Sequence, residues 1–185
     1  MIDIRPLDQF DIDTFRPIAA GYTTAEIYRV AWSESDGQTV FSLTLESLAR
    51  PERFNFPYTA DDIARYTAFV PNDYCWGAYD GDTLVAVALG EAQEWNRTVA
   101  VWEFHVAPAY QRQGIGRRLM AEVAVRAKAA GRRALVLETQ NSNVPAIRFY
   151  RRVGYRLEGV DISYYTNEDM QPGRTVALFM KLRLE

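Results

Sequence analysis

A short glycine-containing loop between a strand pattern and a helix pattern is the segment of this sequence best suited to hold an anion. It lies in HVAPAYQRQGIGRRLM, where the strand pattern stops at Pro108 and a long helix is predicted from about Gly114. The first N–H groups of a helix lack internal partners, and the helix dipole adds roughly half a positive charge there. Gly114 and Gly116 let the main chain approach a phosphate closely. The loop therefore predicts a pyrophosphate site.

Side chains of the same loop add donors near such a phosphate, namely Gln111, Arg112 and Arg117. A dinucleotide-binding fingerprint would begin in a similar way, with Glu138 about twenty residues further on. However, Leu119 stands where the third glycine is needed, and most strand patterns precede the loop, whereas a dinucleotide fold needs several alternating βα units. A glycine loop that merely starts a helix is the structural alternative.

Two side chains on the strand before the loop could move a proton. Because side chains alternate along a strand, Glu103 and His105 are predicted on one face, with Trp102, Phe104 and Val106 on the other. A carboxylate can act as a general base if partial burial raises its pKa, and a histidine titrates near neutral pH. Either residue could be the base, and a strand-face salt bridge or a structural histidine is the alternative.

Cys75 is the only cysteine, so the chain can form neither an internal disulfide nor a zinc cluster of thiolates. We expect no metal site. As a nucleophile Cys75 would have one conceivable histidine base, His105, and we interpret it as a buried structural residue. A covalent enzyme intermediate is therefore not expected.

The elements that position these residues follow from periodicity and turn signals. Strands are predicted at 2–6, 26–32, 39–45, 75–80, 83–95, 97–108, 133–140, 154–163 and 174–182, and helices at 7–21, 59–69, 114–130 and 144–153. Asp36-Gly37 and Gly81-Asp82 predict hairpin turns, and residues 49–58, with two prolines, are interpreted as a loop. This order predicts an α/β (α+β) fold with a mixed, mostly antiparallel central sheet and helices on both faces.

The composition limits the class of protein. A length of 185 residues with 48% hydrophobic residues predicts one globular domain, residues 1–185. A net charge of −3 argues against nucleic-acid binding and suits a small cationic substrate. No segment has the roughly 20 apolar residues of a membrane span, and the N-terminus lacks a basic start, so we expect a cytoplasmic protein. An edge strand could pair across a dimer, so a monomer and a homodimer both stay open.

Two motifs resemble those of one family. Gln111-x-x-Gly114-x-Gly116 is similar to the Gln/Arg-x-x-Gly-x-Gly/Ala signature of GNAT acetyltransferases, on the same strand-loop-helix. Downstream, LETQNSNVPAIRFYRRVGY resembles the family's second motif, a strand followed by an Asn-containing helix start and a Tyr. The resemblance covers residues 83–160 and implies the GNAT fold, with splayed strands that hold acetyl-CoA as cosubstrate.

The resemblance also implies roles for individual residues. Glu103 corresponds to the position of a general base that works through water, Tyr150 would protonate the departing thiolate, and the N–H of Val106 could bind the thioester oxygen. An aromatic core residue is the alternative for Tyr150. The implied cofactor-binding residues are Phe104, His105, Val106, Gln111, Arg112, Gln113, Gly114, Ile115, Gly116, Arg117, Asn143 and Tyr150.

Short phrases elsewhere resemble the streptothricin and nourseothricin acetyltransferases, which modify antibiotics: YTTAEIYRV, EWNRTVAV, LETQNSNVPAIRFY, EGVDISYY and TVALFMKL. They imply acetylation of the β-lysyl amine of a streptothricin-type antibiotic, and hence a resistance enzyme. Trp102 departs from the pattern, because a carboxylate is expected there. A protein or peptide N-acetyltransferase and a non-catalytic acyl-CoA-binding domain are the alternatives. The residues that could line an acceptor opening, with none singled out, are Trp32, Glu34, Asp36, Tyr58, Asp61 and Asp62.

Overall fold

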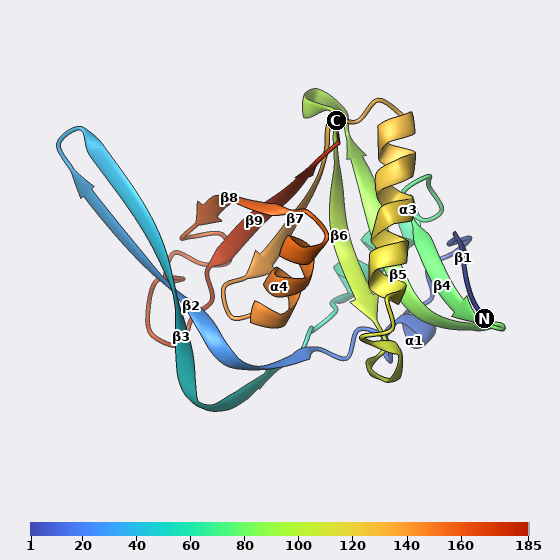
Figure 1. Ribbon diagram of the computed structural model, residues 1–185, viewed down its shortest axis with the longest axis horizontal. Helices are drawn as coiled ribbons and strands as arrows, with labels where there is room; N and C mark the ends of the chain where they lie inside the picture. The colour runs from blue at the N-terminus through green and yellow to red at the C-terminus, as the bar shows by residue number, and fades with distance from the viewer. Residues whose placement is uncertain (185) are drawn as a thin grey trace. The chain divides into compact units, whose positions relative to one another are not determined.

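The computed structural model describes residues 1–184, and its chain divides into two compact units (Figure 1). The first unit comprises Met1–Gly21, Asn55–Leu137 and the end of the chain from Leu182. The second unit comprises Tyr22–Phe54 and Glu138–Lys181. That residues 1–185 form a single domain remains a prediction.

The first unit is built on a mixed sheet. Its elements are β1 (Ile2–Pro6), α1 (Ile12–Phe15), α2 (Ala60–Phe69), β4 (Trp76–Asp80), β5 (Thr83–Gln93), the 3₁₀ helix Glu94–Asn96, β6 (Thr98–Val106), the 3₁₀ helix Pro108–Tyr110, α3 (Ile115–Ala129) and the first part of β7 (Ala134–Gln140). The strands β1, β4, β5 and β6 are antiparallel neighbours in that order. The parallel pairing of β6 with β7 covers only Thr98–Ala100 and Ala134–Val136, although β6 continues to Val106. The predicted mixed, mostly antiparallel sheet is confirmed.

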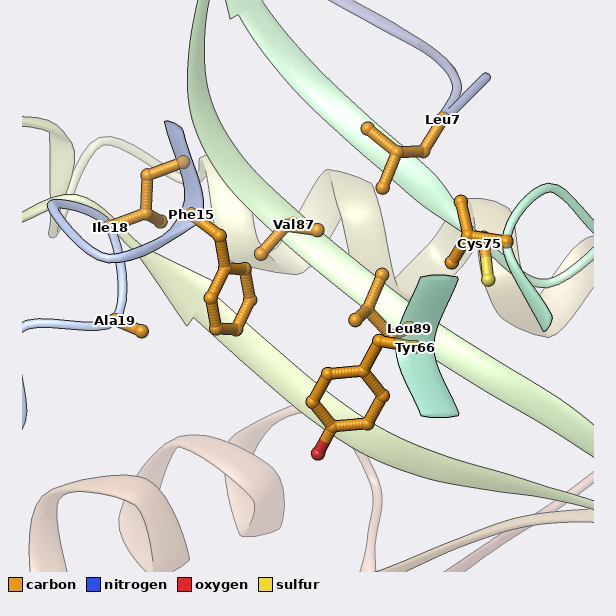
Figure 2. Close-up of a cluster of buried hydrophobic side chains, with 9 residues drawn as sticks. Leu7, Phe15, Ile18, Ala19, Tyr66, Cys75, Val87 and Leu89 are labelled. Carbon is orange, nitrogen blue, oxygen red and sulfur yellow. The ribbon is translucent and has the colours of Figure 1, made fainter. Parts of the chain in front are cut away.

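Helices cover both faces of this sheet, and alternate side chains of β5 pack against the two helical layers. Ala86 and Ala88 are fully buried, and α3 packs along β4, β5 and β6 (Figure 1). Val87 and Leu89 point the other way, into a core with Phe15 of α1 and Tyr66 of α2 (Figure 2). The helices α1 and α2 therefore lie on the same face of the sheet as Glu103 and His105. These two residues pair with Leu89 and Val87 on the neighbouring strand.

Local sequence signals explain where these helices begin and end. Thr59, the first residue of the helix predicted at 59–69, caps α2, and its hydroxyl and the carboxylate of Asp62 form a reciprocal capping box. The helix predicted at 7–21 is limited to α1, because Asp11 caps its start and Pro17 cannot donate an N–H to continue it. No helix within residues 1–184 has the length and apolar character needed to cross a membrane.

The second unit combines a long hairpin with a small sheet. Its elements are β2 (Tyr22–Ser35), β3 (Gln38–Phe54), the end of β7, α4 (Val144–Arg152), β8 (Arg156–Asp161) and β9 (Ala177–Arg183), with β9 between β7 and β8. The predicted turn at Asp36-Gly37 is confirmed, with Gly37 at φ +79. The loop predicted at 49–58 is wrong up to Phe54, because β3 continues to pair with β2. Pro51 is tolerated because it lies where the register shifts, between the pairs Thr24–Glu52 and Glu26–Ser47.

Asn141 joins three segments of the second unit. Its Nδ2 donates to the carbonyl of Tyr28 at 2.9 Å, and its Oδ1 accepts from the N–H of Val176 at 2.9 Å. Its main chain pairs with the same two residues, each at 3.0 Å. Asn141 is only 5% exposed, so these bonds satisfy groups that water does not reach freely.

Replacing Asn141 with alanine is expected to lower the free energy of unfolding by about 2–5 kcal/mol, because two buried main-chain groups lose their partners. Urea unfolding followed by far-UV circular dichroism measures this change. Asn167→Ala is the control, since Asn167 is exposed, and it should stay within about 0.5 kcal/mol of wild type. An unchanged midpoint for Asn141→Ala would show that the side chain does not hold the segments together.

Candidate active site

A bulge in β6 lies beside the predicted base. Leu89 pairs with Glu103 but Gly90 pairs with Val101, so Trp102 is an extra residue on β6. Gly90 is required at this point, because a Cβ there would lie 2.9 Å from the Cβ of Tyr74 and 3.0 Å from its carbonyl oxygen. The bulge changes the direction of the side chains just before Glu103.

Trp102 does not point to the opposite face, and the prediction of strict alternation is wrong at this residue. Its indole Nε1 donates to Glu91 at 2.9 Å, and the guanidinium of Arg65 lies 3.7 Å above the ring. Arg65 belongs to α2, the helix that also contacts Glu103 through Tyr66. Because neighbouring residues at a bulge can share a side, Trp102 and Glu103 both face α2.

Glu103 is the centre of a hydrogen-bonded cluster. Its Oε1 accepts from the hydroxyl of Tyr66 at 2.5 Å, and its Oε2 lies 3.1 Å from the hydroxyl of Tyr58 and 2.6 Å from His105 Nε2. The side chains of Glu103 and His105 are each 13% exposed. Figure 2 shows Tyr66 packed among apolar side chains with its hydroxyl turned away from them. Tyr58, which precedes α2, and Tyr66, on α2, thus hold the carboxylate in place, and the carboxylate keeps some access to solvent.

The two phenols are neutral donors. Burial first, and then the negative charge of Glu103, raises the pKa of Tyr58 and of Tyr66 well above the usual tyrosine value. A carboxylate can only accept, so the short contact to His105 requires a proton on Nε2. A neutral His105 then has its free lone pair on Nδ1, and the rings of Phe15 and Phe56 pack edge-on against the imidazole. This cluster can orient a histidine and take up one proton.

The sequence did not indicate that Tyr58 and Tyr66 contact Glu103. The pattern places Tyr58 only among the residues that could line an acceptor opening, and Tyr66 only within a predicted helix. Tyr66 is on the buried face of α2, which a helical projection places beside Ile63 and Val70. A tyrosine on that face, packed on a strand that carries a carboxylate, is the signal that could have found the pair.

The loop before α3 has an unusual main chain. Arg112 has φ 61 and Gly114 has φ 79, both in the left-handed region. Such residues turn successive N–H groups toward one side, which makes a concave anion site. Gln111 Nε2 donates to the carbonyl of Val106 at 3.0 Å, and Gln113 Nε2 donates to that of Ala109 at 3.0 Å. The two glutamines therefore brace the loop.

The start of α3 fits a phosphate group. No side chain caps its first N–H groups, and a Cβ at Gly114 would meet no atom within 4 Å, so the space beside it is open. Arg112 and Arg117 are exposed nearby, whereas Ile115 and Gly116 are buried on the core side of the helix. Donor N–H groups and two exposed guanidinium groups match the chemistry of a pyrophosphate.

Two further predicted site residues lie in the second unit. Asn143 caps α4, and its Oδ1 accepts from the N–H of Ala146 at 3.3 Å. Tyr150, on α4, is 8% exposed, and its ring lies 5.6 Å from that of Tyr155. Phe104 and Val106 lie on β6 of the first unit and are partly buried.

The remaining sequence candidates separate into structural and exposed residues. Cys75 is fully buried, as predicted, and burial raises the pKa of its thiol to about 11. Asp62 serves the cap of α2. Trp32, Glu34 and Asp36 are exposed near the hairpin turn of the second unit. Residues 1–184 contain no group of three or more His, Cys, Asp or Glu side chains arranged to hold a metal ion.

Known proteins resemble the chain over its full length. A crystal structure of nourseothricin acetyltransferase superposes with a TM-score of 0.75 and 28% identity, covering 100% of this chain and 99% of the other. A candidate streptothricin acetyltransferase from Bacillus anthracis, solved with acetyl coenzyme A, gives a TM-score of 0.76 at 23% identity over 99% of both chains, a likeness of fold.

A relative found by sequence is also an acetyltransferase of this kind. Streptothricin acetyltransferase of Streptomyces lavendulae is 40% identical over 86 residues, which is 46% of this chain and 45% of that enzyme, so the alignment spans about half of either protein. The model of the acetyltransferase (GNAT) family matches residues 38–155, which include β6, the loop before α3 and Tyr150. The chain therefore belongs to the GNAT acetyltransferase family.

Proposed function

We propose that this GNAT acetyltransferase transfers the acetyl group of acetyl-CoA directly to a primary amine of a small cationic acceptor, a streptothricin-type antibiotic in the first instance. The observation that carries the proposal is the hydrogen-bonded cluster of Tyr58 and Tyr66 with Glu103 and His105, because the last two lie on β6, the strand that leads into the loop before α3. The likeness to nourseothricin acetyltransferase over the whole chain supports the choice of acceptor.

The residues of the loop would hold the CoA pyrophosphate. The N–H groups of Gln113 to Arg117 and the side chains of Arg112 and Arg117 supply donors, and Gln111 keeps the loop in shape through Val106. The β6 edge beyond Ala100, where pairing with β7 stops, would accept the pantetheine arm from Phe104 to Val106. The resemblance to the family gives Asn143 a contact with the CoA arm, and Nδ2 would be the donor, since Oδ1 caps α4.

Each chemical requirement of the transfer has a residue. When bound, acetyl-CoA supplies a thioester whose C–S bond breaks as the amine forms its N–C bond. The Glu103–His105 pair would take the proton that the amine loses, and the N–H of Val106 would donate to the carbonyl oxygen. Tyr150 would give a proton to the departing sulfur, which leaves as free thiol. The Glu103–His105 pair then releases its proton to solvent and Tyr150 regains one from solvent, so protons and charge balance with no covalent enzyme intermediate.

The proposal is tested by CoA release from acetyl-CoA by the purified protein with streptothricin, a lysine-bearing peptide or spermidine, with product masses measured. Acetylation of streptothricin with little turnover of the other amines is the expected result. Turnover of the peptide alone would instead identify a protein or peptide N-acetyltransferase. Acetyl-CoA binding without turnover of any amine would overturn the enzymatic proposal and favour an acyl-CoA-binding domain.

A further inference from the structure

Two hydrogen bonds tie the loop before α3 to the β1 side of the sheet in the first unit. Tyr110, the last residue of the 3₁₀ helix that precedes the loop, donates from its hydroxyl to Asp80 Oδ2 at 3.0 Å. Arg118 lies in the first turn of α3, and its Nη2 donates to the carbonyl of Ile2 at 3.1 Å. The loop is therefore held at both of its ends.

Both bonds end at one point of the sheet. Ile2 begins β1 and Asp80 ends β4, and the two residues are partners across this antiparallel pair. Cα atoms of such partners are about 4.5–5.5 Å apart, so the two acceptors are fixed relative to each other. The helix α3 also packs against β1 and β4. Tyr110 and Arg118, on opposite sides of the loop, are thus fixed by the same strand pair.

The main chain between the two ties needs support from outside the loop. Arg112 has φ 61, a conformation that a residue with a Cβ adopts only where its surroundings hold it there. The side chains of Gln111 and Gln113 bond to carbonyls no more than five residues away, so they brace the loop only against itself and the end of β6. The bond of Tyr110 reaches a strand 30 residues away in the sequence. It therefore links the loop to a more distant part of the sheet.

The bond between Tyr110 and Asp80 suits a fixed tie. Its acceptor is a carboxylate, and hydrogen bonds to charged acceptors are stronger than those between neutral groups. The bond raises the pKa of Tyr110, so the phenol keeps its proton at neutral pH. Asp80 pairs with Thr83 across the β4–β5 hairpin as well as with β1, so strands on both sides set the position of the acceptor.

We propose that Tyr110 and Asp80 are positioning residues for acetyl-CoA, which hold the loop before α3 in the conformation that binds the pyrophosphate. This inference rests on the proposed function and adds to it two residues that give no group to the transfer. A loop that is already ordered loses less conformational entropy when its ligand binds, so the affinity is higher. The effect should accordingly fall on the binding of acetyl-CoA and not on kcat.

The test is a calorimetric titration of acetyl-CoA, without any amine, into wild type and variants of the pair. The dissociation constant should rise about fivefold in Tyr110→Phe and in Asp80→Ala, because each removes one partner of a hydrogen bond to a charged group. The double variant should lose no more than either single variant. Asp80→Asn should stay within about twofold of wild type, since the amide oxygen can accept from the phenol. Equal affinity in wild type and Tyr110→Phe would overturn the proposal.

Asp82→Ala is the matched control, because Asp82 is exposed in the turn that follows β4. It removes the same charge from the same hairpin but leaves the bond between Tyr110 and Asp80 in place. Its affinity for acetyl-CoA should equal that of wild type, and far-UV circular dichroism checks the folding of every variant. A loss as large as that of Asp80→Ala would mean that the charge of the hairpin, and not the bond to Tyr110, sets the affinity.

A second thioester separates positioning of the loop from a general structural defect. S-acetylpantetheine lacks the pyrophosphate, so Tyr110→Phe should keep the wild-type kcat/KM with this donor. With acetyl-CoA, kcat/KM should fall about fivefold at an unchanged kcat. An equal loss with both donors would refute the positioning role.

The titration also distinguishes failure of this inference from failure of the proposed function. If wild type binds acetyl-CoA but acetylates no amine, the proposed function fails, and the affinities of the variants still decide the role of Tyr110. If wild type acetylates amines and Tyr110→Phe binds acetyl-CoA as tightly as wild type does, only the positioning role is refuted. Wild type that binds no acetyl-CoA would overturn both.

Discussion

Replacing Glu103 with glutamine is expected to lower kcat/KM for amine acetylation by about 10²–10⁴-fold, the usual contribution of a general base. The amide keeps the shape of the side chain but removes the negative charge to which Tyr58, Tyr66 and His105 are hydrogen-bonded. The amide has a single acceptor oxygen, so it cannot accept from Tyr66 on one side and from Tyr58 and His105 on the other. Steady-state CoA release with the preferred amine measures the loss, and the dissociation constant of acetyl-CoA should stay within about twofold of wild type, since the loop before α3 is untouched.

Glu91→Gln is the matched control for this prediction. Glu91 lies on β5 of the same sheet and pairs with Arg65 at 3.3 Å and with Trp102, but it does not contact the Glu103 cluster. Its variant should keep wild-type turnover. A comparable loss in Glu91→Gln would mean that charge on the sheet, and not proton transfer at Glu103, sets the rate. His105→Asn distinguishes the base, because it should cost little if Glu103 acts alone through water.

The parts of the fold that depend on local signals could be predicted from the sequence. Thr59 and Asp62 lie three residues apart and specify the cap of α2, and Asp36-Gly37 specifies the hairpin turn. Gly114 was predicted at the start of α3, and its positive φ follows from the tight loop before the helix. Each signal acts within a few residues, so no knowledge of the sheet is needed.

The site's details depend on pairing between strands, which a periodic pattern does not encode. Strict alternation placed Trp102 opposite Glu103, but one extra residue on β6 brings both toward α2. Gly90 was a usable signal, because an isolated glycine in a strand pattern often marks a bulge or a close approach. The partner that requires this glycine, Tyr74, comes from a distant segment and could not be read from the pattern.

The length of the β2–β3 hairpin also depends on strand pairing that a local sequence pattern does not encode. Two prolines indicated a loop at 49–58, yet Thr23 and Thr24 extend the pairing to Arg53 and Glu52. A proline excludes a regular ladder position but not an irregular one, and the irregularity is set by the partner strand. The role of Tyr58 was missed for a related reason, since its contact with Glu103 joins residues that are 45 positions apart.

Tyr150→Phe is expected to lower kcat by about 10²-fold while the affinity for acetyl-CoA stays unchanged, because the ring remains and only the phenolic proton is lost. Tyr150 is 8% exposed and packs against Phe149 and Tyr155, so phenylalanine fits the same space. Single-turnover acetyl transfer and equilibrium binding of acetyl-CoA measure the two quantities separately. Tyr164→Phe, which alters an exposed phenol of the same unit, should leave both unchanged.

The outcome for Tyr150→Phe decides between a proton donor and an aromatic core residue. A core residue would tolerate the loss of one hydroxyl with little effect on turnover, and any effect would be on the free energy of unfolding. A proton donor would lose turnover at an unchanged unfolding midpoint, because the departing thiolate must then be protonated by water. Wild-type turnover in Tyr150→Phe would remove this residue from the chemistry and leave the Glu103 cluster as the only side-chain group that moves a proton in the proposed reaction.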